Sequence, residues 1–163
     1  MPQSLETAIA ESFEEYQRFR DQDCHYSAIA RLAEIENCSR RMPGIEGQQW
    51  SEMALGEAIP EKAITEVHRQ MAADARRIEH ILSIGNEWND DELTLILTLR
   101  ITLELVQTYL ERRGIEAALD LERVDTRIRE VASSAQNKRV FNLVVGEVRD
   151  RWAIESRWLY SFS

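Results

Sequence analysis

The chain has 163 residues, a net charge of −9, and only six glycines and three prolines. This length and an apolar content of 44% are typical of one folded domain and exclude an intrinsically disordered chain. The acidic balance excludes the basic footprint that sequence-independent nucleic-acid binding requires. Residues 1–60 hold 11 acidic and 5 basic side chains, a net charge of −6, so this segment is the one suited to a basic partner.

The scarcity of turn residues predicts long helices, and the first is expected to run from Ser4 to about Arg40. Ser4 is a suitable N-cap for an apolar stripe at helical spacing. The stripe contains Leu5, Ile9, Phe13 and Tyr16 and continues nearly in phase through Cys24, Ala28, Leu32 and Ile35. Helix propensity falls over residues 21–25, but no glycine or proline lies there, so we predict one helix with a kink rather than two helices.

A long connection follows at about residues 42–59 and contains three of the six glycines. Within it, residues 48–55 could form a short helix that carries Trp50. Pro60 suits the first turn of the next helix, which is predicted to end at Gly85. The apolar stripe of this helix contains Ile64, Val67, Met71, Ala75, Ile78 and Leu82.

Residues 90–113 form the most apolar segment and the predicted centre of the fold. Apolar and polar residues alternate in its first half, as in a strand, but strands usually have only about 3–10 residues. The polar side chains Arg100, Glu104, Gln107 and Glu111 lie on one helical stripe, which predicts a helix with one side facing water. Arg100 and Glu104 also argue against a membrane span, which needs about 20 apolar residues.

Two more helices are predicted after Gly114, with a turn at residues 133–137 between them. Leu121, Val124, Ile128 and Val131 form the stripe of the first. The last helix is expected to reach about Tyr160, with Glu147, Arg151 and Glu155 forming an i, i+4 ladder. Short connections imply antiparallel neighbours, so the sequence predicts an all-α, up-and-down bundle of four to five long antiparallel helices in a single domain, residues 1–163.

The three histidines do not have the spacing of a metal site. His68 and His80 are the best candidates, but they are 12 residues apart on one helix and point about 120° away from each other. We therefore predict no metal and no cofactor. As an alternative, His80 could accept phosphate as the histidine of a phosphotransfer module, although the lysine and small residues expected after such a histidine are missing.

Other patterns that carry chemistry are equally sparse. Glu11 with Glu14, and Glu122 with Asp125, have the spacing expected in a magnesium-dependent nucleotide pyrophosphatase, and a metal- or nucleotide-dependent enzyme is kept as an alternative. The adjacent Cys24 and His25 do not by themselves make a catalytic dyad. No phosphate-binding loop, zinc-protease or hydrolase motif occurs, so no catalytic residue is predicted. The acidic N-terminus lacks the apolar stretch of a signal peptide, which predicts a cytoplasmic protein.

The last 12 residues contain an aromatic cluster where chains usually fray. This tail either folds back as part of the core or forms an anchor for a protein partner or a second copy, because Trp, Tyr and Arg dominate interface hot spots. The anchor residues would be Trp152, Arg157, Trp158, Tyr160 and Phe162. The leading hypothesis is a non-catalytic, protein-binding helical protein (an adaptor, chaperone or regulatory inhibitor) that acts as a homodimer, does not bind nucleic acid or membranes, and has a partner that could be basic.

Overall fold

The computed structural model describes residues 3–84, 88–117, 119–151 and 155–160, and these residues form eight helices and no strand. The helices are α1 (Leu5–Asp21), α2 (His25–Arg40), α3 (Gly44–Gly56), α4 (Glu61–Ile84), α5 (Asp90–Arg112), α6 (Leu121–Ala132), α7 (Ala135–Arg151) and α8 (Arg157–Tyr160). The prediction of an all-α protein is confirmed. The prediction of four to five long helices is not, because seven helices in the described part of the chain have twelve or more residues.

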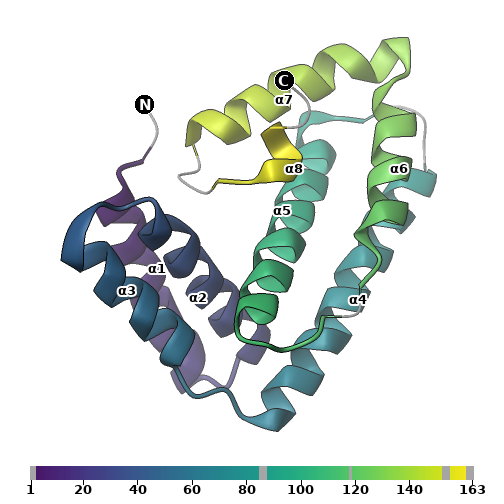
Figure 1. The fold of residues 1–163 in the computed structure, drawn as a ribbon. Coiled ribbons are helices and arrows are strands. Elements are labelled where there is room, and N and C mark those ends of the chain that lie inside the picture. The colour runs from purple at the N-terminus through teal and green to yellow at the C-terminus, as the bar shows by residue number, and fades with distance from the viewer. Residues whose placement is uncertain (1–2, 85–87, 118, 152–154, 161–163) are drawn as a thin grey trace.

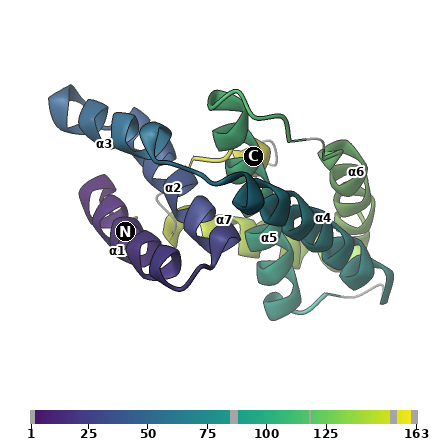
Figure 2. The same ribbon diagram turned by 90° about the horizontal axis from the view of Figure 1, so that it is seen from below.

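The helices form two groups that meet at α2 (Figure 1). The first group is α1, α2 and α3. In the second, α4 packs against both α5 and α6, and α7 crosses the end of α5 and α6 (Figures 1 and 2). Helix α2 contacts α1 and α3 on one side and α4 and α5 on the other. The acidic N-terminal third is therefore a three-helix layer, and α2 joins it to the rest of the core.

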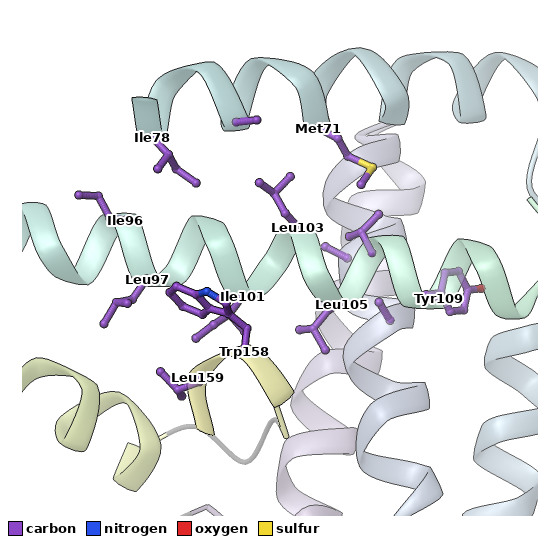
Figure 3. Close-up of a cluster of buried hydrophobic side chains, with 14 of the residues drawn as sticks. Met71, Ile78, Ile96, Leu97, Ile101, Leu103, Leu105, Tyr109, Trp158 and Leu159 are labelled. Carbon is purple, nitrogen blue, oxygen red and sulfur yellow. The ribbon is translucent and has the colours of Figure 1, made fainter. Parts of the chain in front are cut away.

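Helix α5 is the centre of that core, as the sequence predicts. It contacts α2, α4, α7 and α8, and side chains such as Leu93, Ile96 and Leu103 are completely buried. Figure 3 shows Met71 and Ile78 of α4 on one side of α5, and Trp158 and Leu159 of α8 on another. Among the described helices, α5 alone is long and apolar enough to cross a membrane. The core helix of a soluble protein passes the same test, so this is weak evidence. In this structure, 56% of the apolar window of α5 is buried inside the fold.

The predicted continuous first helix is wrong, because α1 ends at Asp21 and α2 begins at His25. Asp23 adopts a left-handed conformation with φ of 56°. The backbone N–H of Cys24 then donates to the carbonyl of Phe19, and that of Asp23 donates to the carbonyl of Arg20. These two bonds form a Schellman motif, which closes a helix even where no glycine is present.

Helix α3 packs closely against the end of α2 at Gly47. A Cβ atom at position 47 would lie 2.3 Å from the carbonyl oxygen of Met42 and 2.9 Å from that of Ser39. Because both neighbours are backbone atoms, Gly47→Ala is expected to lower the free energy of unfolding by about 1–3 kcal/mol in urea titrations. Gly56→Ala is the control, since a Cβ there has nothing within 4 Å and should cost nothing.

The C-terminal third differs from its prediction at three places, the first of which is the start of α7 at Ala135, inside the predicted turn at residues 133–137. Residues 115–117 and 119–120 are not helical, and α6 begins only after Asp120, whose side chain accepts a hydrogen bond from the backbone N–H of Glu122. Helix α7 ends at Arg151, so Glu155 lies outside it and the predicted ladder through Glu155 is not formed. The predicted apolar stripes of α4 and α6 do face the core, except at Ile64, which is half-buried and lies outside the core cluster.

Candidate binding cleft and acidic surface

Residues 155–160, here called the C-terminal segment, pack on α5 instead of continuing α7 (Figure 3). Trp158 and Leu159 are 5% and 3% exposed and belong to the core cluster. The Ser156 hydroxyl donates to the carboxylate of Glu104 and accepts from the backbone N–H of Leu159, so it caps α8. The backbone N–H of Trp158 also points to Glu104, at 3.5 Å.

Arg100 is the second contact point of the C-terminal segment, and it is 4% exposed. Its guanidinium donates to both carboxylate oxygens of Asp125, at 2.6 and 2.9 Å, and lies 4.9 Å from the centre of the Trp158 ring. The predicted polar stripe of α5 therefore does not face water at Arg100. An ion pair from α6 and an aromatic ring from α8 cover it, while Glu111, further along the stripe, is exposed.

Asn37 fastens the same segment to α2. Its amide nitrogen donates to the carbonyl oxygen of Glu155 at 2.9 Å, and its carbonyl oxygen accepts from the backbone N–H of Glu155 at 3.0 Å. Asn37 is buried, so both bonds are shielded from water. The C-terminal segment is thereby tied to α2 and α5 at once, although 118 residues separate Asn37 from Glu155.

A polar cleft of about 330 Å³ lies between α2 and α5, beside the C-terminal segment. We call it the α2–α5 cleft. The side chains that line it are Ala33, Glu36, Asn37, Arg40 and Arg41 of the α2 region, Glu104, Leu105, Thr108, Glu111 and Arg112 of α5, and Glu155. Cleft volumes of about 300–1,000 Å³ are typical of small-molecule sites.

Glu36 is the carboxylate in the cleft that contacts two arginines, and it is 1% exposed. The Nε atoms of Arg40, from α2, and Arg112, from α5, each lie 2.9 Å from its Oε1 atom. Arg41 is 3.5 Å from Glu155 at the edge of the cleft. The sequence offered no motif for any of these residues, and none was predicted as a site residue.

Neither cysteine shows the environment of a catalytic nucleophile. Cys38 is buried, and burial raises the pKa of its thiol to about 11, with a smaller opposing effect from Arg41. The reactive form is the thiolate, so Cys38 stays protonated near neutral pH. Cys24 is exposed and is not paired with Cys38.

The structure places only part of the predicted aromatic anchor. Trp158 is a core residue, so it is not an exposed anchor in this chain. Arg157 and Tyr160 begin and end α8, but their side chains lie outside the described part of the structure. Trp152 and Phe162 lie outside the described residues altogether.

The predicted catalytic alternatives are not brought together. His68 and His80 are both exposed on α4, and no group of three or more metal-binding side chains occurs among the described residues. Glu11 and Glu14 are exposed on α1, whereas Asp125 on α6 is bound to Arg100. Asp125 thus serves the core rather than a paired-carboxylate site.

The layer of α1, α2 and α3 carries an excess of unpaired exposed carboxylates. The arginines of this layer are mostly engaged internally: Arg20 with Glu57, Arg31 with Glu15 and Glu34, and Arg40 with Glu36. Six exposed acidic side chains make no ion pair with the described residues. These six residues, here called the acidic surface, are Glu6, Glu11, Glu14, Asp23, Glu46 and Glu52.

A buried carboxylate, Glu34, links α1 to α2 behind this surface. It accepts from the hydroxyl of Ser12 at 3.0 Å and from Arg31 at 2.6 Å. Burial raises the pKa of the Glu34 carboxyl above its ordinary value, and Arg31 and Ser12 offset only part of this effect. The charged form of Glu34 is therefore less favourable in the folded chain than in the unfolded chain.

Glu34 should consequently make stability depend on pH. Because the pKa of Glu34 is higher in the folded chain than in the unfolded chain, the unfolded chain ionises first as the pH rises. The stability that is present below the unfolded pKa is therefore lost as the pH rises from there through the folded pKa. Glu34→Gln, measured by urea unfolding from about pH 4 to pH 7, is expected to become progressively more stable relative to wild type. A stability difference that stays constant over this range would show that Glu34 has no raised pKa.

No protein-family model, no curated protein and no solved structure matches this chain.

Proposed function

We propose that this is a non-catalytic helical protein that binds a basic protein partner through the acidic surface. The observation that carries the proposal is the charge imbalance on the α1–α3 layer. Three of its arginines, Arg20, Arg31 and Arg40, are held by carboxylates within the fold, while six exposed carboxylates have no ion pair within the described part. Complementary charge would steer such a partner and raise the rate of association.

The architecture supports a binding role because contacts within the acidic layer hold its helices together. Phe13 of α1 and Trp50 of α3 are in edge-to-face contact at 5.2 Å, and the Tyr16 hydroxyl donates to Glu57 at 2.7 Å. These contacts fix α1 against α3, so the carboxylates project from a preorganised helical scaffold. Preorganisation lowers the entropic cost of binding.

The biological role within this class stays a prediction: adaptor, chaperone or regulatory inhibitor. The homodimer, the cytoplasmic location and the lack of nucleic-acid and membrane binding also stay predictions from the sequence. The homodimer now depends on surfaces other than Trp158, because this side chain lies in the core of one chain. Light scattering, compared with the 19.0 kDa chain mass, measures the oligomeric state directly.

The test is affinity capture from a cell extract with matched charge variants. Glu11, Glu14, Glu46 and Glu52 are changed to Gln in one variant. The control variant changes four exposed carboxylates elsewhere, Glu116, Glu122, Glu130 and Glu147, to Gln, so both lose the same charge. We expect the wild type and the control variant to capture a partner with a basic surface, and the first variant to lose it. The captured partner should dissociate as the salt concentration rises. Equal capture by both variants would refute the proposal.

A further inference from the structure

The α2–α5 cleft contains an incomplete hydrogen-bonding arrangement around Glu36. Oε1 of Glu36 is buried and has the Nε atoms of Arg40 and Arg112 at 2.9 Å, but neither contact has hydrogen-bond geometry. No hydrogen bond among the described residues uses the donors of Arg40 or Arg112. A buried carboxylate oxygen without an aligned donor is costly, so a group that supplies one would be stabilised there.

The charges at this point also do not balance. Two guanidinium groups, one from α2 and one from α5, share a single carboxylate, which leaves a local excess of one positive charge. Arg41 and Glu155 already pair with each other, and Glu104 is occupied by Ser156 and the Trp158 backbone. No further carboxylate is paired with Arg40 or Arg112 among the described residues, and guanidinium groups are well suited to hold an oxyanion.

The lining of the same cleft also carries negative charge. Glu111 lines it, is exposed, and makes no ion pair among the described residues. A ligand that places an oxyanion between the two arginines would thus also meet carboxylates that accept from an ammonium group. The cleft volume of about 330 Å³ is at the small end of ligand sites and suits a metabolite-sized molecule.

We propose that the α2–α5 cleft binds a small zwitterionic molecule, with a phosphate or carboxylate group between Arg40 and Arg112 and an ammonium group facing Glu36 and Glu111. This site goes beyond the proposed protein-binding role, because its residues are separate from those of the acidic surface. Ligand binding there would tie α2 to α5, one of the two core helices that α2 contacts.

The test is titration calorimetry at low salt with four small probes: phosphoethanolamine, β-alanine, inorganic phosphate and ethanolamine. The first two are zwitterions that carry a phosphate and a carboxylate, and the last two carry one charged group each. We expect at least one zwitterion to bind at least about tenfold more tightly than inorganic phosphate and ethanolamine, since it satisfies both ends of the cleft. The better zwitterion identifies which oxyanion the arginines prefer.

Variants separate binding in the cleft from non-specific attraction. Arg112→Gln and Arg40→Gln are each expected to weaken the zwitterion by about tenfold or more, through loss of a charge-assisted contact. Arg127→Gln is the control, because Arg127 pairs with Glu130 on the exposed side of α6. Circular dichroism shows whether each variant is folded. If one of the two cleft variants does not fold, the other still tests the proposal. The proposal is overturned if neither zwitterion binds at about 10 mM, if the single-charge probes bind equally well, or if both cleft variants bind like wild type.

Discussion

Truncation of the chain after Arg157 is expected to lower the free energy of unfolding by at least about 4 kcal/mol, because it removes two buried side chains from the core. Trp158 and Leu159 are almost fully enclosed against α5. Their removal leaves a cavity, exposes Arg100 and takes away the backbone N–H groups that point to Glu104 and Ser156. Urea unfolding followed by circular dichroism measures the loss.

Point variants show whether the loss comes from packing rather than from shortening the chain. Trp158→Ala alone should cost about 3–5 kcal/mol, a large share of the stability of a typical domain. Leu143→Ala on α7 is the matched control, because that side chain is 58% exposed and its truncation should cost little. A truncated chain that keeps the wild-type stability but has a lower oligomeric mass would instead show that the tail is an interface anchor.

Asp125→Ala should be almost as damaging, with an expected loss of about 3–5 kcal/mol. The guanidinium of Arg100 is buried, and Asp125 is its only charged partner in the described structure. Removing the carboxylate leaves a positive charge in a low-dielectric environment, with the Trp158 ring 4.9 Å away as its remaining electrostatic partner. Breaking one side of such a pair costs more than an ordinary hydrogen bond is worth.

A paired replacement tests this cause. Arg100→Met combined with Asp125→Leu removes both charges and should recover most of the lost stability, since an apolar pair of similar volume avoids the desolvation cost. Glu130→Ala on the same helix provides the comparison, because its ion pair with Arg127 is exposed and should contribute less than about 1 kcal/mol. If Asp125→Ala and Glu130→Ala have equal effects, the Arg100 pair is not buried in solution.

Much of the fold could be predicted because helical periodicity depends on local sequence. The apolar stripe of α4, the capping role of Ser4 and the end of α5 at Gly114 all follow from patterns a few residues long. Gly114 has a φ of 74°, and Ile115 N–H donates to the carbonyl of Leu110, as a Schellman motif requires.

The features that were missed depend on contacts between distant segments or on rare backbone conformations. The break between α1 and α2 was missed because the residue in the left-handed conformation is Asp23, whereas a glycine is the usual sequence signal for that conformation. Arg100 was expected to face water because its stripe is polar, yet its partner Asp125 is 25 residues away. The pattern of a helix shows which side is polar, but not whether another helix covers that side.

The two candidate sites also differ in how far the sequence alone predicts them. The acidity of residues 1–60 can be read from composition, and the structure adds that internal ion pairs hold most of the arginines there. The α2–α5 cleft was not predicted, because Glu36 and Arg112 belong to no motif and meet only when α2 packs against α5. Helix α2 buries four polar residues, Glu34, Glu36, Asn37 and Ser39, and only the structure shows this burial.

Docking of the C-terminal segment on α2 and α5 is the central structural claim, since it shapes the cleft and leaves the acidic surface as the candidate protein-binding face. Amide hydrogen exchange of the intact chain tests it without a mutation. The backbone N–H groups of Glu155 and Leu159 should be protected, because they donate to Asn37 and Ser156 within the packed segment. Exchange of both at the rate of an unstructured peptide, while the amides of α5 remain protected, would contradict the docked arrangement.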